Sequence, residues 1–510
     1  MRMNLKKGKA RGFFMVGAQL GTFCLVYLLL SACAAMTPSA SSAPPPTQYS
    51  LHHLGPQDQW QLIYLKDMPA GLSHFKILPS EFAGAYRIES FFLLRYTLLG
   101  SQQENSWKGQ ELVYGNLDLQ TFALEGKQGE DTLKLKGTVR ERVLYVEKEF
   151  RGQKEQHRLS LSSPLKSSLS PYFMPLLAGP QKGQSMTLSV FQFDPQNFVG
   201  TLELTLEDWE TQPSGKVVCR IRSQMMGMTS YAYVSPQGEV LEEQMLGGLL
   251  RSEKISAEQG EHFLLGQALA KTDLLLDFSL VPADKKIDRP ETLKSLTLEM
   301  QGLAAKDFPH DARQKILSMS TAGQNSFTVK IEKEARPGSY AEKAESLAPY
   351  LAASPVIQSR DPKMEDKAGE IAGSVADPGQ KARLLHSWVY QRLKKTFRES
   401  YTAREALEVM EGECQSHSKL FAALSRAAGL PAKVVNGLVY IPDLGKNGFL
   451  YHSWNEVYLS GRWVAVDPTL GQFLVDATHI KLTEGERFQE IVLLANTVGK
   501  LKIKIVGEER

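Results

Sequence analysis

The chain is poor in cysteine: its 510 residues include only Cys24, Cys33, Cys219 and Cys414. Cys24 lies in an apolar run near the N-terminus, so the rest of the chain holds three thiols. Small secreted domains need dense disulfides because their cores are small, whereas a chain of this length with 42% apolar residues can bury a core without them. The composition therefore excludes a disulfide scaffold and indicates two or three globular domains.

The chain also lacks a strong charge of either sign. The formal net charge is +3, but residues 1–32 contribute five basic side chains (Arg2, Lys6, Lys7, Lys9, Arg11) and no acidic one. The remainder has 54 basic and 56 acidic residues, which gives about −2. A nearly neutral chain offers no electrostatic reason to expect a nucleic acid as its partner.

The first 32 residues have the pattern of a secretory signal peptide. A basic start is followed by an apolar run from about Phe13 to Leu30 and then by small residues. The segment Leu30-Ser31-Ala32-Cys33 resembles the lipobox of bacterial lipoproteins, which implies that Cys33 is lipidated and becomes the first mature residue. The alternative is an uncleaved transmembrane anchor, because the run is nearly long enough to span a bilayer.

Both interpretations of the N-terminus place the remainder outside the cytoplasm. We expect a protein of the bacterial cell envelope, lipid-anchored to a membrane and facing the periplasm or the exterior. Residues 33–48 are rich in Pro and Ser and carry no charge, which predicts a flexible tether.

The middle of the chain is free of catalytic motifs and alternates with a period of two. Examples are "TLKLKG", "TLELTLEDW" and "KVVCRIR", while "YAYVSPQGEVLEE" has the pattern of two strands joined by a turn. Residues 49–289 are therefore predicted to form a β-rich, mainly antiparallel domain of unknown role, with Cys219 in its core. Residues 290–339 are predicted to supply connecting strands, and residues 340–510 a second domain.

The second domain places a cysteine at a reactive position. In "GECQSHSKLFAALSRAAGLPAKVVNG" (412–437), apolar residues recur with helical spacing after Cys414, and Gly429 and Pro431 end the helix. A helix N-terminus favours the thiolate, although a free cysteine is more commonly a buried core residue. Farther along, His452 lies on one predicted strand and Asp467 ends the next, so that a hairpin could bring these side chains together.

An imidazole beside a thiol can accept its proton, and a carboxylate can hold the imidazole. The order Cys414, His452, Asp467 resembles the catalytic triad of the transglutaminase-like superfamily, and the flanking "GECQ…RAAGLPAKVVNG" and "HSWNEVYLSGRWVAVDPT" resemble its motifs. The resemblance implies an α+β fold, with the cysteine helix packed against antiparallel sheet. It also implies acyl transfer from a peptide or protein amide through a thioester to water or an amine.

Details near the cysteine sharpen these expectations. Glu411 and Glu413 should raise the pKa of Cys414, but we expect the helix terminus and His452 to outweigh them and to hold it below about 8.5. His417 is interpreted as structural, because its position on the same helix is poor for reaching the thiol. No cofactor or metal is expected, since no EF-hand spacing and no second Cys/His pair appear.

Three alternatives remain open at this point. The domain could be a cysteine hydrolase or transamidase. It could instead be a non-catalytic envelope binding or scaffold module, since the superfamily includes members that have lost catalysis. In a third interpretation the β-rich domain carries the main function. The sequence does not indicate the oligomeric state.

Overall fold

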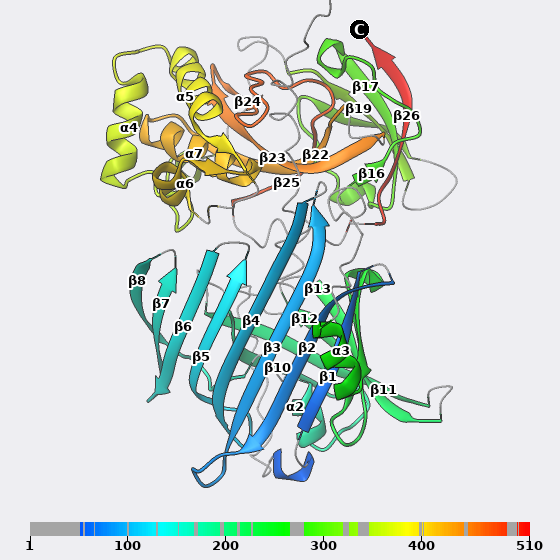
Figure 1. Ribbon diagram of the computed structural model, residues 1–510. Coiled ribbons are helices and arrows are strands. Elements are labelled where there is room, and N and C mark those ends of the chain that lie inside the picture. The colour runs from blue at the N-terminus through cyan, green and yellow to red at the C-terminus, as the bar shows by residue number, and fades with distance from the viewer. Residues whose placement is uncertain are drawn as a thin grey trace, which may run out of the picture. The chain divides into compact units, whose positions relative to one another are not determined.

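The structure is a computed structural model of the full chain (Figure 1). It describes residues 51–54, 57–65, 67–98, 101–128, 131–150, 152–167, 172–193, 198–211, 215–225, 228–265, 280–319, 326–334, 346–396, 400, 402–442, 447–486, 497 and 499–510. The expected signal peptide, Cys33 and the tether lie outside these residues. No helix in the described ranges is long and apolar enough to cross a membrane.

The described residues belong to two compact units. The first unit ends at Asp273, and the second runs from Leu274 to Arg510. The sequence placed the boundary near residue 290. Strand β16 (Leu280–Pro282), which precedes that point, pairs with β23 of the second unit. Each unit has its own sheets and its own core, and each is described by itself.

The described part of the first unit consists almost entirely of one sheet, in which fifteen strands follow the order β8-β7-β6-β5-β4-β3-β2-β1-β15-β14-β13-β12-β11-β10-β9. All neighbours are antiparallel except β9 and β10. The strands are β1 (Gln57–Leu65), β2 (Met68–Pro79), β3 (Ala85–Leu98), β4 (Ser101–Tyr114), β5 (Leu119–Gln128), β6 (Asp131–Arg140), β7 (Val143–Phe150), β8 (Gln153–Ser160), β9 (Leu165–Lys166), β10 (Ser185–Phe191), β11 (Val199–Thr211), β12 (Val217–Met225), β13 (Met228–Val234), β14 (Val240–Met245) and β15 (Leu250–Ile255). Short helices α2 (Phe173–Leu177) and α3 (Ala257–Leu265) accompany it.

The alternating sequence pattern explains this sheet. Leu202, Leu204 and Leu206 on β11 are all buried, as the period of two requires for one covered face. Cys219 on β12 is fully buried, which agrees with a core role. Val217 is two residues before Cys219 and so lies on the same face of β12, but it is 48% exposed because it is the first residue of the strand.

The described part of the second unit contains four α-helices and three sheets. Its helices are α4 (Pro362–Ala372), α5 (Pro378–Arg392), α6 (Ala403–Val409) and α7 (Cys414–Ala427). One sheet has the order β16-β23-β22-β25, with β24 also paired to β23; a second has the order β18-β19-β17-β26; and β20 pairs with β21. Besides β16, its strands are β17 (Ser295–Gln301), β18 (Gln314–Met319), β19 (Ser326–Glu332), β20 (Lys394–Lys395), β21 (Glu411–Gly412), β22 (Ala432–Tyr440), β23 (Gly448–Leu459), β24 (Arg462–Val466), β25 (Ile480–Glu484) and β26 (Lys502–Glu509).

The long strands β22 and β23 connect two apolar cores. One core lies between the helices and residues such as Val434, Val457 and Val464. The other lies between the four-stranded sheet and residues such as Leu438 and Tyr451. Figure 1 accordingly shows the helices beside one part of β23 and strands β17, β19 and β26 beside the other. The predicted α+β fold class, with helices packed on antiparallel sheet after a β domain, is confirmed.

One strand has a different partner from the expected one. The segment "KLKIKIVG" (500–507) alternates apolar residues with lysines, which predicts a half-exposed strand that closes the sheet of the second domain. Strand β26 contains most of this segment and pairs with β17 in the separate four-stranded sheet. Its alternation predicts a half-buried strand correctly, but alternation carries no information about which edge the strand joins.

Candidate active site

Cys414 is the first residue of helix α7, as the sequence predicted. The preceding residue, Glu413, is the N-cap: its carboxylate accepts hydrogen bonds from the backbone N–H groups of Gln415 at 2.8 Å and Ser416 at 3.0 Å. An acidic N-cap satisfies helix N–H groups that have no partner within the helix. The helix packs against β23, so its N-terminus and the thiol are held against the sheet.

The thiol is buried and donates a hydrogen bond to Glu413 Oε2 at 3.1 Å. Burial raises the pKa of Cys414 well above its usual value, and the charge and hydrogen bond of Glu413 raise it further. A hydrogen bond from the backbone N–H of Ser453 acts in the opposite direction. The expectation of a depressed thiol pKa is therefore wrong for this structure, because burial and Glu413 dominate over the helix terminus.

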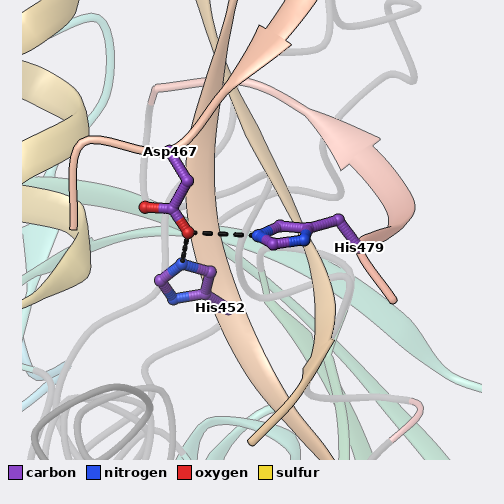
Figure 2. Close-up of side chains that lie close together, drawn as sticks. All are labelled: His452, Asp467 and His479. Carbon is purple, nitrogen blue, oxygen red and sulfur yellow. Dashed lines mark hydrogen bonds and ion pairs between the residues drawn. The ribbon is translucent and has the colours of Figure 1, made fainter. Parts of the chain in front are cut away.

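His452 and Asp467 are brought together by the hairpin that the sequence predicted. His452 lies on β23, and Asp467 follows β24 directly. The Nε2 of His452 donates to Asp467 Oδ2 at 2.8 Å, and both side chains are fully buried (Figure 2). The other ring nitrogen, Nδ1, has no hydrogen-bond partner among the described residues.

The described part of the chain shows no hydrogen bond between the Cys414 thiol and His452. The thiol lies beside the backbone of Ser453, the residue next to His452, and its proton is directed to Glu413. The structure thus brings all three predicted residues into one buried region but joins only two of them directly. The base nitrogen of a neutral His452 would be Nδ1, because Nε2 holds the proton donated to Asp467.

The carboxylate of Asp467 has partners on both oxygens. Oδ1 accepts the backbone N–H groups of Thr469 at 2.7 Å and Leu470 at 2.9 Å. Oδ2 accepts His452 and also His479 at 3.1 Å. Burial alone would raise the pKa of Asp467, but the charges and hydrogen bonds of the two histidines bring it well below its usual value. Asp467 is therefore a fixed, ionised acceptor.

His417 has the structural surroundings that its helical position predicts. It is fully buried, and its ring nitrogens face the carbonyl oxygens of Glu413 at 2.8 Å and Leu393 at 3.3 Å. Burial lowers the pKa of His417 to about 4, so the ring is neutral at physiological pH. With one ring proton, it donates to the nearer carbonyl.

Two residues that follow His452 on β23 brace the site. The side-chain amide of Asn455 donates to the carbonyl oxygens of Ser418 on α7 and Lys433 on β22, which ties the helix to the sheet. Trp454 is fully buried and its ring stacks near His452, with ring centroids 6.1 Å apart. Asn455 and Trp454 therefore support the site by hydrogen bonds and by packing.

Two histidines of the site were not singled out by sequence reasoning. His386 on α5 donates from Nε2 to the backbone carbonyl oxygen of Asp467 at 2.9 Å. His479 precedes β25 and lies within "VDATHI", a segment without a familiar motif. The only available signal was the pairing of Asp476 and His479 three residues apart, and that spacing is common in chains without a site.

His452, Asp467 and His479 are also the described residues whose ligand atoms lie closely enough, within 4.8 Å of one another, to hold a metal ion. The atoms concerned already bond to each other: Oδ2 of Asp467 accepts from Nε2 of both histidines. The hydrogen bonds account for this cluster, and the expectation of a site without metal stays a prediction.

Comparison with known proteins agrees with the resemblance seen in the sequence. Residues 365–468 match the model of the transglutaminase-like superfamily. Kyphoscoliosis peptidase of Mus musculus is 34% identical over 90 residues, which are 17% of this chain and 14% of the peptidase. The uncharacterised protein YebA of Bacillus subtilis is 36% identical over 84 residues, 14% of this chain and 11% of that protein. The chain thus spans only a small part of the length of these relatives.

A solved structure from Cytophaga hutchinsonii, described as a "Putative Cysteine Protease", is 18% identical and covers 41% of this chain and 82% of its own, with a TM-score of 0.28. This score is too low to bear on the argument. The family match is local but direct, and residues 365–468 are a transglutaminase-like domain. This segment contains Cys414, His452 and Asp467.

Proposed function

We propose that the protein is a lipid-anchored, extracytoplasmic cysteine enzyme that cleaves or transfers amide bonds of peptides or proteins. Cys414 is the nucleophile, His452 the acid–base group and Asp467 the residue that orients it. The observation that carries the proposal is the state of His452: Nε2 is bound to Asp467, while Nδ1 has no hydrogen-bond partner in the part of the chain that the structure describes. The backbone of the next residue, Ser453, contacts the thiol.

The first half-reaction forms a thioester. Nδ1 of His452 takes the thiol proton as the sulfur of Cys414 attacks the amide carbonyl carbon, which forms a tetrahedral intermediate. The C–N bond then breaks, and the proton on His452 passes to the departing amine. Asp467 keeps its negative charge throughout and stabilises the imidazolium that forms.

The second half-reaction releases the acyl group. Water or an amine gives a proton to His452 and attacks the thioester carbonyl carbon, the C–S bond breaks, and the sulfur takes the proton back. The capping bonds of Glu413 occupy the N–H groups of Gln415 and Ser416, so the backbone N–H of Cys414 is proposed as one donor to the acyl oxygen.

The raised thiol pKa fits a site that is at rest until substrate binds. A proton held between Cys414 and Glu413 keeps the sulfur neutral, which protects it from oxidation outside the cytoplasm. An amide bound next to the sulfur would exclude water and move the thiol away from Glu413 toward His452. The proton transfer is then coupled to attack rather than completed beforehand.

Turnover can be measured with general amide probes. Release of dye from quenched casein reports hydrolysis, and incorporation of dansylcadaverine into casein reports amine transfer. Wild type should be active in at least one assay, and Cys414→Ala and His452→Ala should be inactive in both. Asp467→Asn should keep the fold and lose several orders of magnitude of activity, because the uncharged amide does not stabilise the imidazolium and favours the wrong imidazole tautomer. Full activity of Cys414→Ala would contradict the mechanism.

A second function is favoured by the same burial. The thiol is only 2% exposed and is bonded to Glu413, which also fits a domain that binds its partner without turnover. In that case, Cys414→Ala would retain binding of the partner, and neither assay would detect turnover in wild type. A pull-down with Cys414→Ala serves both cases, since it traps a substrate or captures a partner.

The anchor is a separate part of the proposal. Its support is the sequence Leu30-Ser31-Ala32-Cys33 after an apolar run. Cys33→Ser should release the protein from the membrane fraction, because acyl chains would be the only attachment. Membrane association that persists in this variant would indicate an uncleaved helix.

A further inference from the structure

His479 is a buried ionisable group that the proposed mechanism does not use. Its ring is fully buried and lies between two carboxylates: Nε2 is 3.1 Å from Asp467 Oδ2, and Nδ1 is 3.2 Å from Asp476 Oδ1 (Figure 2 shows the first of these contacts). Oδ2 of Asp467 therefore has two histidine partners, His452 and His479. Only His452 is followed in the chain by the backbone N–H that contacts the thiol.

The two contacts define the protonation of His479. Both partners are carboxylate oxygens, which accept hydrogen bonds, so both ring nitrogens must carry protons. Burial alone would lower the pKa of His479, but the hydrogen bonds and charges of Asp467 and Asp476 outweigh it and raise the pKa. Asp476 is ionised, since its bonds to His479, Thr478 and Gln472 outweigh burial and lower its pKa to about 2.

Asp476 is itself held rigidly. Its Oδ1 accepts from the backbone N–H of Thr478 at 2.8 Å and from the hydroxyl of the same residue. Its Oδ2 accepts from the side-chain amide of Gln472 at 2.9 Å. Gln472 in turn exchanges two backbone hydrogen bonds with Asp467. Hydrogen bonds therefore run from Asp467 through Gln472 and Asp476 to His479, which bonds back to Asp467.

The four-stranded sheet holds the segment that carries His479. Arg313, which directly precedes β18, is buried and donates from Nη2 to the carbonyl oxygens of Asp476 at 2.9 Å and His479 at 3.4 Å. Gln314 is fully buried, and its side chain makes two hydrogen bonds with the backbone of Lys481. Arg313 and Gln314, at the start of β18, therefore fix the backbone on both sides of His479.

A glycine allows this segment to approach His452. Gly437 on β22 lies opposite His452 on β23 and pairs with Lys481 on β25. A Cβ at this position would lie 2.0 Å from the carbonyl oxygen of Ile480 and 2.8 Å from the ring of Trp454. Only glycine lets the backbone after His479 lie this close.

From this geometry we propose that His479 is a positioning residue for the reaction: as an imidazolium it holds Oδ2 of Asp467, the same oxygen that binds His452, and the four-stranded sheet holds His479. The inference rests on the proposed function. Without His479, Oδ2 of Asp467 would have His452 as its single side-chain partner. The backbone bonds to Oδ1 would remain, but the carboxylate could then turn about them and move Oδ2 away from His452.

The charge of His479 also acts on the site. The titratable groups that face His479 are Asp467, Asp476 and His452. The guanidinium of Arg313 is the nearby charged group, and it bonds to the backbone carbonyl oxygen of Asp476. Loss of the imidazolium removes a positive charge from this buried cluster. The remaining groups then hold their protons more tightly, and any reaction that needs a deprotonated site shifts to higher pH.

The experiment measures the rate of alkylation of Cys414 by iodoacetamide, followed at the peptide level by mass spectrometry, in the full chain between pH 5 and pH 9. The variants are His479→Gln, His452→Ala and the double variant. We expect His479→Gln to react about tenfold more slowly at pH 7 and its profile to move to higher pH, an effect typical of coupled buried pairs. In the His452→Ala background the same substitution should change nothing.

A second variant covers the case in which His479→Gln does not fold. Asp476→Asn keeps the ring but removes one of the two carboxylates that hold its charge, so it should shift the profile in the same direction by less. Wild-type profiles for His479→Gln and Asp476→Asn would overturn the role of His479. An equal slowing by His479→Gln with and without His452 would also overturn it, since it would show a purely structural effect.

The two levels of the proposal fail differently. If His452→Ala reacts at the wild-type rate, the proposed function is wrong and the role of His479 falls with it. If His452→Ala is slow while His479→Gln reacts like wild type, only the role of His479 is wrong.

Discussion

Glu413 performs two tasks at the N-terminus of α7 that act against each other. Its carboxylate caps the helix, and it also accepts the thiol proton of Cys414. After burial, its charge and hydrogen bond are the main causes that raise the thiol pKa. The residue thus stabilises the helix while it keeps the nucleophile protonated.

Replacing Glu413 by Gln should separate the two tasks. The amide oxygen can still cap the helix, but the negative charge is gone, so the thiol pKa falls. Since each unit of pKa changes the thiolate fraction about tenfold, alkylation of Cys414 at pH 8 should accelerate by roughly tenfold or more. Glu411→Gln is the matched control, because Glu411 is two residues farther away and is not among the causes of the shift. Equal rates in wild type and Glu413→Gln would contradict this account.

His417 should affect the stability of the protein and not the reactivity of the thiol. Its ring is buried, neutral and bonded to backbone carbonyl oxygens. His417→Ala should lower the free energy of unfolding by about 2–3 kcal/mol through lost packing and hydrogen bonding. The reactivity of Cys414 should change little, in contrast to His452→Ala. A loss of reactivity as large as that of His452→Ala would mean that the wrong histidine has been assigned as the base.

The sequence was most informative where motif and local structure coincide. The helix start at Cys414 and the hairpin that joins His452 to Asp467 both follow from periodicity and turn residues. The thiol pKa could not be predicted, because it depends on burial and on the direction of the Glu413 side chain. His479 could not be found either, since its partners Asp467 and Asp476 become adjacent only when the loop after β24 closes.

At the scale of elements, Glu334 connects the four-stranded sheet to the sheet of the site. It lies two residues beyond β19 and is buried. Its Oε1 accepts from Arg462 at 2.8 Å, and its Oε2 accepts from the backbone N–H of Ala465 at 2.8 Å. Strand β24, which leads to Asp467, is therefore fixed at two points by one side chain from outside its own sheet.

Removal of this carboxylate should be costly. Glu334→Ala leaves the buried guanidinium of Arg462 without this partner, a change that typically costs about 3–5 kcal/mol. Hydrogen exchange of the peptide over residues 462–466 should accelerate on the order of 100-fold. Glu332→Ala is the control, because Glu332 is exposed and its ion pair with Lys330 should be worth little. Similar exchange in both variants would show that Glu334 does not hold β24.

The sequence predicted the strands of this connecting region but not their role. "SLTLEMQGL" and "NSFTVKIEKE" have a clear period of two and form β17 and β19. The pairing of β17 with β26 joins residues about 200 positions apart. Periodicity is a local signal, so it could not reveal that these strands support the segment carrying His479.

At the scale of the whole molecule, the chain contains two units with separate cores. The second unit includes β16, whose Val281 is buried in its core, and Ile287, whose backbone N–H donates to the hydroxyl of Tyr440. Asp284 accepts from the backbone N–H of Ile505 at 2.8 Å. Val281, Asp284 and Ile287 all precede residue 290, so the second unit begins before that point.

A fragment of residues 274–510 should therefore fold alone and keep the reactivity of Cys414. A fragment of residues 290–510 lacks β16 and the contacts of Val281 and Ile287, and should be less stable by several kcal/mol, since burying each such side chain contributes about 1.5–3 kcal/mol. Thermal unfolding of the two fragments compares them directly. An insoluble, protease-sensitive 274–510 fragment would show that the second unit depends on the first.

The central claim is that His452 serves as the base for Cys414, and one measurement tests it most directly. The rate of Cys414 alkylation is followed from pH 5 to pH 11 in wild type and in His452→Ala. Wild type should be faster at pH 7 by about 10²–10⁴-fold, the usual contribution of a positioned base, and the two profiles should converge at high pH, where the thiol ionises without help. Superimposable profiles across the whole range would contradict the claim and leave the domain as a binding module.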